Sequence, residues 1–107
     1  MRRGELVTIS LPGNYGKPRP ALVIQSDLFD SHPSVTVLPV TSELRDLPLF
    51  RVRIEPGKSN GLRALSEVMV DKTHTVAREK VGSRIGQLED EAIMAVNRAL
   101  ATFLGFT

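Results

Sequence analysis

Short apolar runs and polar residues follow one another along most of the chain in the pattern of β-strands. From Glu5 to Leu11 the residues alternate, which places Val7 and Ile9 on one face together with Leu11. A period of two residues is typical of a strand with one buried face. The segment from Ala21 to Gln25 is instead almost continuously apolar. It predicts a strand in the centre of a sheet.

Further strands are predicted from Val35 to Thr41, Leu49 to Ile54, Leu65 to Asp71, His74 to Ala77 and Val81 to Gln87. Pro39 has no N–H to donate, so its strand is expected at an edge or a bulge. In the fourth strand we expect Arg51 and Arg53 to point outward, because the apolar residues between and beside them alternate inward. Ser26 to Ser34 is a connection with one helical turn, and Arg78 to Lys80 is a tight turn.

The C-terminal segment is the only one with helical periodicity. Its apolar residues fall on one helix face: Ile93, Val96, Leu100, Phe103 and Leu104. Glu89 is the expected N-cap, the acidic residues at 89–91 oppose the helix dipole favourably, and Gly105 ends the helix. Many short strands followed by one helix predict an α+β fold, a small β-barrel with a helix across it, in one domain covering residues 1–107.

Composition narrows the chemistry. The chain has 107 residues, no Cys and two His, which excludes disulfides and thiolate zinc sites and argues against a histidine metal site. Few aromatic residues argue against a base-stacking platform. We see no apolar run of bilayer length and no signal peptide, so we expect a soluble cytoplasmic protein without a membrane partner.

Charge is unevenly distributed. Residues 1–86 carry 13 basic and 9 acidic side chains, whereas residues 87–107 carry one basic and three acidic side chains. The body of the protein is therefore basic, which favours a polyanionic partner, although solvated surface charge explains the same balance.

A basic turn leads directly into the second predicted strand. Pro18 and Pro20 restrict their own φ angles and push the residues before them, Lys17 and Arg19, toward extended conformations. Arg19 is thereby mounted on a stiff segment, and its planar fork of five donors suits a phosphate or a carboxylate.

Polar residues at the predicted strand ends are the candidate site: Glu5, Arg19, Thr41, Ser42 and Asp71. Each has a structural alternative. Arg19 can pair with Glu5 on the surface, Thr41 can form a turn, and Asp71 can simply end its strand. No phosphate-binding glycine loop, metal-ligand pair or serine-elbow motif accompanies them. The residues alone leave these alternatives open.

Several segments, in the same order, resemble the MazF/PemK toxins. They are Arg3-Gly4-Glu5-Leu6, the run from Arg19 to Ile24, Leu38-Pro39-Val40-Thr41-Ser42, the run from Val70 to Gly82, and Ile85-Gly86-Gln87-Leu88. The resemblance implies a twisted SH3-like or CcdB-like barrel that forms a homodimer. It also implies an endoribonuclease that cuts single-stranded RNA without a metal or another cofactor. A cognate antitoxin, whose flexible acidic segment fills the RNA groove, is the implied partner.

Carried over by position, the resemblance makes Arg19, Thr41 and Asp71 the catalytic residues. The RNA 2′-OH is the nucleophile, with Asp71 as its base and Arg19 stabilising the phosphorane. Thr41 anchors the phosphate or orients Arg19, and the expected ends are a 2′,3′-cyclic phosphate and a 5′-hydroxyl. An aspartate is ordinarily a weak base near neutral pH, so the groove would have to strengthen it. The expected RNA-binding residues are Glu5, Lys17, Ser42, Arg51, Lys72 and His74.

Two departures accompany the resemblance. Met69 stands where the PemK branch has a second arginine, proposed there as general acid, so water or His74 would protonate the leaving oxygen. His74 is expected on the opposite face from Asp71, as a surface histidine. The loop from Pro12 to Lys17 is also short and lacks a histidine found in relatives.

Two other functions stay open. One is a non-catalytic inhibitor of the CcdB type, which binds gyrase through the C-terminal residues Leu104 to Thr107. The other is an RNA-binding barrel whose catalytic site has decayed, a possibility that Met69 raises.

Overall fold

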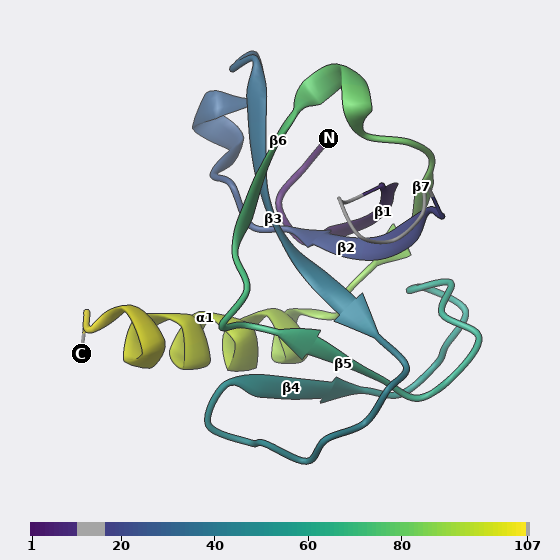
Figure 1. Ribbon diagram of the computed structural model, residues 1–107, viewed down its shortest axis with the longest axis vertical. Coiled ribbons are helices and arrows are strands. Elements are labelled where there is room, and N and C mark those ends of the chain that lie inside the picture. Colours follow the sequence, from purple (N-terminus) through teal and green to yellow (C-terminus); the bar gives the residue numbers. More distant parts are fainter. Residues whose placement is uncertain (11–16, 107) are drawn as a thin grey trace.

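The computed structural model describes residues 1–10 and 17–106, and in this part of the chain antiparallel strands form one curled sheet beside an α-helix (Figure 1). The strands are β1 (Glu5–Ile9), β2 (Arg19–Val23), β3 (Ser34–Thr41), β4 (Arg51–Ile54), β5 (Ser66–Met69), β6 (His74–Ala77) and β7 (Arg84–Gln87). Two 3₁₀ turns, η1 (Asp27–Phe29) and η2 (Arg78–Lys80), precede β3 and β7, and α1 (Asp90–Leu104) follows β7. The predicted α+β class is confirmed.

The strand β3 changes partner along one of its edges. Its first half, Ser34 to Val37, pairs with β6, and its end, Val40 to Thr41, pairs with β5, while β2 pairs with its other edge. Pro39 falls between the two partners. The Ile24 N–H donates to the Thr36 carbonyl, so the backbone groups of Thr36 point toward β2. Backbone groups alternate in direction along a strand, and the nitrogen of Pro39, three residues later, therefore points away from β2 and into this gap. The expected edge position is wrong: β3 is central, and the gap is what accommodates the proline.

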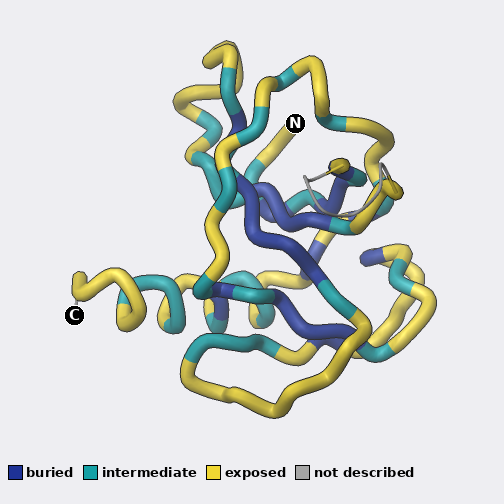
Figure 2. The backbone as a smooth tube through the Cα atoms, viewed as in Figure 1, coloured by how far each residue is buried: buried dark blue, intermediate teal, exposed yellow. Residues whose placement is uncertain are grey.

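Two apolar clusters lie on opposite faces of β1, β2 and β3. One, inside the curl of the sheet, consists of Val7, Ile9, Ala21, Val23, Val35 and Val37. The other is shared with the remaining strands and with Val96 of α1, and its members are Leu6, Leu22, Leu38, Val40, Ile54, Val68, Val70, Leu88 and Val96. Figure 2 shows that buried residues concentrate along the central strands of the sheet. Burial on both faces explains the nearly continuous apolar run of β2.

The helix begins and ends where its capping signals predict. Glu89 is the N-cap, and Gly105 is the C-cap with a left-handed φ of 80°. The helix approaches the chain closely at Gly4, where a Cβ atom would lie 2.7 Å from Cδ1 of Ile93. Phe103 and Leu104 were expected on the packed face, yet they are 49% and 46% exposed. The last turns of α1 extend past the strands, so the sheet does not cover them (Figures 1 and 2).

The long connection between β4 and β5 is fastened to β7. The Asn60 side-chain oxygen accepts the N–H groups of Gly57 (3.0 Å) and Leu62 (2.9 Å). Its amide nitrogen donates to the Glu55 carbonyl at 2.9 Å. At Gly86, a Cβ atom would lie 2.5 Å from the carbonyl oxygens of Ser59 and Asn60. The connection therefore keeps one shape and one position against β7.

Most strands are shorter than predicted, while β6 has the predicted bounds. The first strand ends at Ile9 within the described residues, and Leu11 and the predicted turn Pro12 to Gly16 lie outside them. Leu49 and Phe50 form a turn before β4, and β5 ends at Met69 with Val70 and Asp71 in the next turn. No helix in the described part of the chain is long and apolar enough to cross a membrane.

Candidate active site

A groove of about 1160 Å³ opens where the end of β1, the start of β2 and the end of β3 meet. The connection between β4 and β5 contributes residues 61–64 to its lining. Glu43, Ser66, Met69, Lys72, His74 and Ile85 line it as well. These segments are far apart in the sequence, so the sheet topology alone brings them to one place. The groove contains several of the predicted site residues and excludes others.

Arg19 lies in this groove as the first residue of β2. Its neighbours Pro18 and Pro20 also line the groove, and Ile9 is its partner in β1. Arg19 is exposed and makes no hydrogen bond or ion pair with the described residues. The alternative of a surface pair with Glu5 does not occur, because the Glu5 carboxylate binds Arg84 instead. The guanidinium is thus mounted between two prolines, and its donors have no acceptor among residues 1–10 and 17–106.

Thr41 ends β3 in the same groove. The β2–β3 ladder ends at the pair Ala21–Pro39, so Arg19 stands two residues before that pair in β2 and Thr41 two residues after it in β3. The Thr41 hydroxyl oxygen accepts the N–H of Glu43 at 3.0 Å, so Thr41 does form a turn. This bond uses only an acceptor position and leaves the hydroxyl proton for another acceptor. Ser42 follows in the lining.

Asp71 is not part of the groove lining, although Met69 and Lys72 on either side of it are. It lies in the turn after β5, which is closed by a bond from the Lys72 N–H to the Met69 carbonyl (3.2 Å). Its side chain is 21% exposed, with Oδ2 3.9 Å from Nζ of Lys72. The Oδ1 atom is buried and accepts no hydrogen bond from the described residues. The structure therefore brings together two of the three predicted catalytic groups.

His74 lines the groove. It was expected among the RNA-binding residues, but on the opposite face from Asp71 and at the outer surface if the strand stayed regular. The turn at Val70 and Asp71 interrupts the strand, so the side-chain alternation that separated His74 from Asp71 does not continue through it. His74 then begins β6, opposite Val37 of β3. Met69, at the position expected from the resemblance for a second arginine, lines the groove as well.

Glu5, Lys17 and Arg51 lie outside the lining. Oε2 of Glu5 accepts from Nε of Arg84 and Oε1 from the Arg2 N–H, both at 2.6 Å. Burial raises the pKa of Glu5, but these bonds outweigh it and hold the pKa below its ordinary value. Lys17 is exposed beside Pro18. Arg51 was expected to point outward, yet its side chain is 10% exposed and binds Glu67.

Glu67 is the centre of the molecule's buried electrostatics. Its side chain is 2% exposed, and each of its two carboxylate oxygens accepts two hydrogen bonds. The backbone N–H groups of Arg45 (3.0 Å) and Asp46 (3.3 Å) donate to them. So do the guanidinium groups of Arg51 (3.2 Å) and Arg53 (2.9 Å). Burial raises the pKa of Glu67, but the four donors outweigh it and lower the pKa to about 2.

The comparison with known families decides the classification. The model of the PemK-like, MazF-like toxins of type II toxin–antitoxin systems matches residues 2–104. The chain belongs to this family. The match confirms the MazF/PemK resemblance seen in the sequence.

Relatives of this toxin support the same placement. A protein of Mycolicibacterium smegmatis described as a probable endoribonuclease MazF is 47% identical over 106 residues, which are 98% of this chain and 97% of the relative. The Mycobacterium tuberculosis toxin MazF-mt6 superposes with a TM-score of 0.81 at 27% identity and covers 94% of this chain and 96% of its own.

Two further structures share the fold of the toxin. A mycobacterial endoribonuclease in complex with its cognate antitoxin superposes with a TM-score of 0.83 at 23% identity, covering 100% of this chain and 97% of its own. A MazE–MazF complex from Deinococcus radiodurans gives 0.79 at 24% identity, covering 98% and 96%. These likenesses confirm the predicted twisted sheet with one C-terminal helix.

Two residues of the toxin's groove region were missed from the sequence. Arg63 lines the groove from the β4–β5 connection, is exposed, and makes no hydrogen bond or ion pair with the described residues. The Asn60-Gly61 turn signal just before it marked this segment as a loop and nothing more. Glu67 was missed because an acidic residue within a short strand carries no local sign of its partners. Within residues 1–10 and 17–106, no cluster of three or more His, Asp or Glu side chains is arranged to hold a metal ion.

We expect the Glu67 carboxylate to make this toxin sensitive to acid. Its pKa is lowered in the folded state from 4.5 to about 2, so its contribution to stability is complete above pH 4.5 and is lost as the pH falls toward 2. Urea unfolding of the wild type and of Glu67→Gln at pH 7 and pH 3 measures this. The wild type should be more stable at pH 7, and the difference between the two proteins should shrink at pH 3. A difference that is the same at both pH values would contradict the assignment.

Proposed function

We propose that this toxin is an endoribonuclease that cleaves single-stranded RNA in the groove between β1, β2, β3 and the β4–β5 connection. The observation that carries the proposal is that one open groove is lined both by Arg19, whose side chain has no partner among the described residues, and by Thr41. The family membership and the 47% identical probable endoribonuclease MazF support it. They favour it over a gyrase-binding inhibitor and over a decayed RNA-binding barrel. Cellular RNA as substrate implies action in the cytoplasm.

The chemistry requires little from the protein because RNA supplies its own nucleophile. The 2′-oxygen forms a bond to the adjacent phosphorus, and the bond from phosphorus to the 5′-oxygen breaks. This leaves a 2′,3′-cyclic phosphate and a 5′-hydroxyl. Negative charge on the equatorial oxygens rises in the transition state, and Arg19 stabilises it through several N–H donors. Thr41 holds the same phosphate with the hydroxyl proton that its bond to Glu43 leaves free.

For the proton of the 2′-OH we propose His74. It lines the groove with Arg19 and Thr41, whereas Asp71 does not. A neutral imidazole accepts a proton near neutral pH, and water protonates the departing 5′-oxygen. Asp71 has a different environment, with one carboxylate oxygen buried and the other 3.9 Å from Nζ of Lys72. It stays the competing candidate for the base.

Positive charge along the groove accounts for binding of the rest of the strand. Lys72 lines the groove beside His74, and Arg63 lines it from residues 61–64 of the β4–β5 connection. We propose that both contact phosphates flanking the scissile one, and that Ser42 hydrogen-bonds the strand where it leaves Thr41. Contacts of this kind bind any sequence and weaken as salt concentration rises.

Replacement of Arg19 tests the proposal directly. The wild type should cut a long mixed-sequence RNA in the presence of a chelator and leave 5′-hydroxyl ends. Arg19→Ala should lower the cleavage rate by about 10²-fold or more, the usual effect of removing a donor to transition-state charge. Mapping of the RNA ends gives both results.

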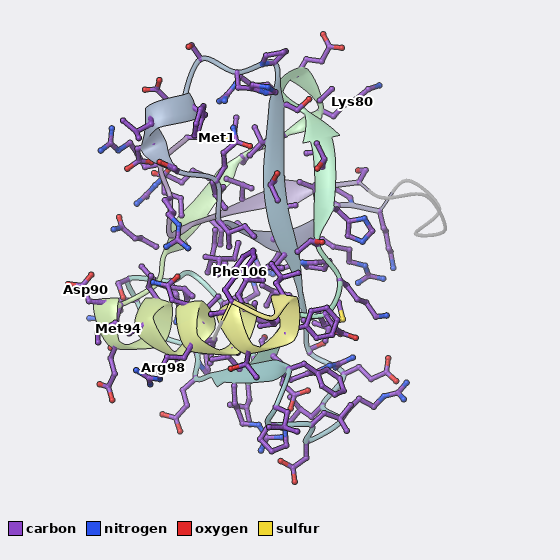
Figure 3. The ribbon with its side chains drawn as sticks, turned by 90° about the vertical axis from the view of Figure 1, so that its left-hand side faces the viewer. Met1, Lys80, Asp90, Met94, Arg98 and Phe106 are labelled. Carbon is purple, nitrogen blue, oxygen red and sulfur yellow. The ribbon has the colours of Figure 1, made fainter. Side chains whose placement is uncertain are left out.

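Arg98→Ala is the matched control for this experiment. Arg98 is exposed on α1, one turn after Met94 (Figure 3), and is not among the residues that line the groove. The Arg98→Ala variant should cleave RNA at the wild-type rate. Intact RNA with the wild-type protein over a wide range of sequences would remove the proposed activity.

A pair of conservative substitutions identifies the residue that accepts the proton of the 2′-OH. His74→Gln should lower kcat by about 10²-fold, as removal of a general base does, while Asp71→Asn should stay close to wild type. Single-turnover cleavage with saturating protein measures both. His32→Gln is the control, since His32 lies before β3 and outside the groove lining. A large loss in Asp71→Asn with none in His74→Gln would transfer the role to Asp71.

We further propose that an antitoxin blocks the groove and that the toxin forms a homodimer. Structures of the same fold are complexes with a cognate antitoxin, or of MazE with MazF. An acidic antitoxin segment would be attracted by the groove cations Arg19, Arg63 and Lys72. The exposed apolar side chains at the end of α1 include Phe106, which is 79% exposed. A second copy that covers them removes apolar surface from water.

The assembly is checked in solution. Sedimentation equilibrium should give twice the 11.8 kDa of one chain, and a lower mass for Phe103→Ser or Phe106→Ser because each removes apolar contact area. A wild-type mass equal to one chain would contradict the dimer. A dimer that both substitutions leave intact would place its interface away from this end of α1.

A further inference from the structure

A row of three side chains crosses the sheet beside the groove. In the ladder between β3 and β5, Thr41 is the direct partner of Glu67, and in the ladder between β4 and β5 Glu67 is the direct partner of Arg53. Of the three, Thr41 lines the groove and Glu67 is buried. The buried carboxylate therefore lies next to the strand end that carries the groove hydroxyl.

Glu67 and Arg51 together bind the backbone that follows Thr41. The Glu67 carboxylate accepts the N–H groups of Arg45 and Asp46 at 3.0 and 3.3 Å. Nη1 of Arg51 donates both to Glu67 (3.2 Å) and to the Glu43 carbonyl (3.3 Å). We call this set of bonds to residues 43–46 the Glu67 clasp. Asp46 has a φ of 54°, which non-glycine residues adopt infrequently, and the clasp holds its N–H in that conformation.

The clasp ends one bond from the groove hydroxyl. Glu43 is bound at its carbonyl by Arg51 and at its N–H by Oγ1 of Thr41 (3.0 Å). The bond from Glu43 orients one side of the Thr41 hydroxyl, and so determines where its remaining donor and acceptor positions point. Movement of Glu43 would release this orientation without disturbing the strand pairing of β3.

We infer that Glu67 is a positioning residue for the RNA-cleaving site: through Arg51 and the turn at Glu43 it orients the Thr41 hydroxyl toward the scissile phosphate. This inference rests on the proposed function, because it assigns Glu67 an effect on the Thr41 role in cleavage. It adds a residue that touches neither RNA nor the groove.

A charged acceptor is required at position 67. All four of its partners are donors, two backbone N–H groups and two guanidinium groups. A glutamine keeps the shape but must present an NH₂ group to one pair of these donors. That pair is left without an acceptor in a buried place, and the backbone of residues 45–46 is the part free to move away.

A double-mutant cycle distinguishes positioning from general stabilisation. Single-turnover rates are measured for the wild type, Glu67→Gln, Thr41→Ala and the double variant. Glu67→Gln should lower kcat by about tenfold, a coupling of the size found between residues in one hydrogen-bond network, with KM unchanged. In the Thr41→Ala background the same change should have no further effect. If the rate of the double variant is reduced by the product of the two single reductions, the two residues act independently and the inference is overturned.

Two further variants separate the proposed effect from unfolding of the protein and from the loss of a surface ion pair. If Glu67→Gln does not fold at the assay temperature, Arg51→Met enters the cycle in its place, because it removes the donor to the Glu43 carbonyl and leaves the backbone bonds to Glu67. Arg45→Ala is the control. It removes the exposed Arg45–Glu43 ion pair of 2.6 Å but keeps the Arg45 N–H in the clasp. Its kcat should equal that of the wild type, and a tenfold loss would show that the pair, not the clasp, orients the turn.

Amide hydrogen exchange gives a readout that does not depend on cleavage. The N–H of Glu43 should exchange at least tenfold faster in Glu67→Gln than in the wild type, while the N–H groups of β2 keep their protection. Unchanged protection at Glu43 would overturn the inference. If the wild type fails to cleave RNA, the proposed function fails. If the wild type cleaves and the cycle is multiplicative, only the role of Glu67 fails.

Discussion

The exchange of partners along β3 is the constraint on which the rest of the structure depends. A strand that pairs with β6 over its first half and with β5 at its end cannot belong to a flat sheet, because the two partners leave it in different directions. One half of the sheet therefore closes around the inner valine-rich cluster, and the other half spreads beneath α1. The groove opens where these halves separate, at the end of β3. Thr41 is in the groove because it is the residue at which β3 ends.

The ion pairs of the molecule differ in what they hold. Arg2–Asp27 and Arg45–Glu43 join exposed side chains, and such pairs contribute little to stability. Glu67 differs because its carboxylate is buried and every one of its bonds is to a donor, so the loss of any partner leaves an uncompensated charge or an orphaned N–H. The hydrogen bonds of this network form only in one conformation of residues 43–46, so they stabilise that conformation. The main consequence of the network is the geometry of the turn at the mouth of the groove.

Local sequence signals predicted the elements whose boundaries depend on local physics. Capping residues and dipole charges located both ends of α1. The two prolines predicted an extended backbone at Arg19, and β2 begins there, two residues before the predicted start at Ala21. Arg51 failed for a non-local reason: alternation placed it on the outer face of β4, but the turn after β3 and the carboxylate of Glu67 cover that face. Phe103 and Leu104 failed because periodicity identifies a helix face and says nothing of the width of the sheet beneath it.

The candidate site, like the fold, was predictable where local sequence signals determine it and not where distant segments do. Arg19 and Thr41 line one groove because β2 begins and β3 ends at the same side of the ladder that pairs these consecutive strands. Asp71 and His74 were expected on opposite faces of one regular strand, but a turn of two residues ends β5 early and interrupts the alternation, and of the two only His74 lines the groove. Arg63 had no signal at all, since nothing local shows that a distant loop faces the strand ends.

The fastening of the β4–β5 connection to β7 has a consequence for how such a groove can diversify. Gly86 and Gly61 bring two backbone segments so close that a methyl group at either position would collide with main-chain atoms. Arg63 and Ala64, which follow in the lining, are exposed and have no such restriction, whereas Leu62 packs against the apolar core. Variation at 63 and 64 changes what the wall offers to a base or a phosphate while the wall itself stays in place. Selection for a new recognition sequence thus has two adjustable positions on a fixed support.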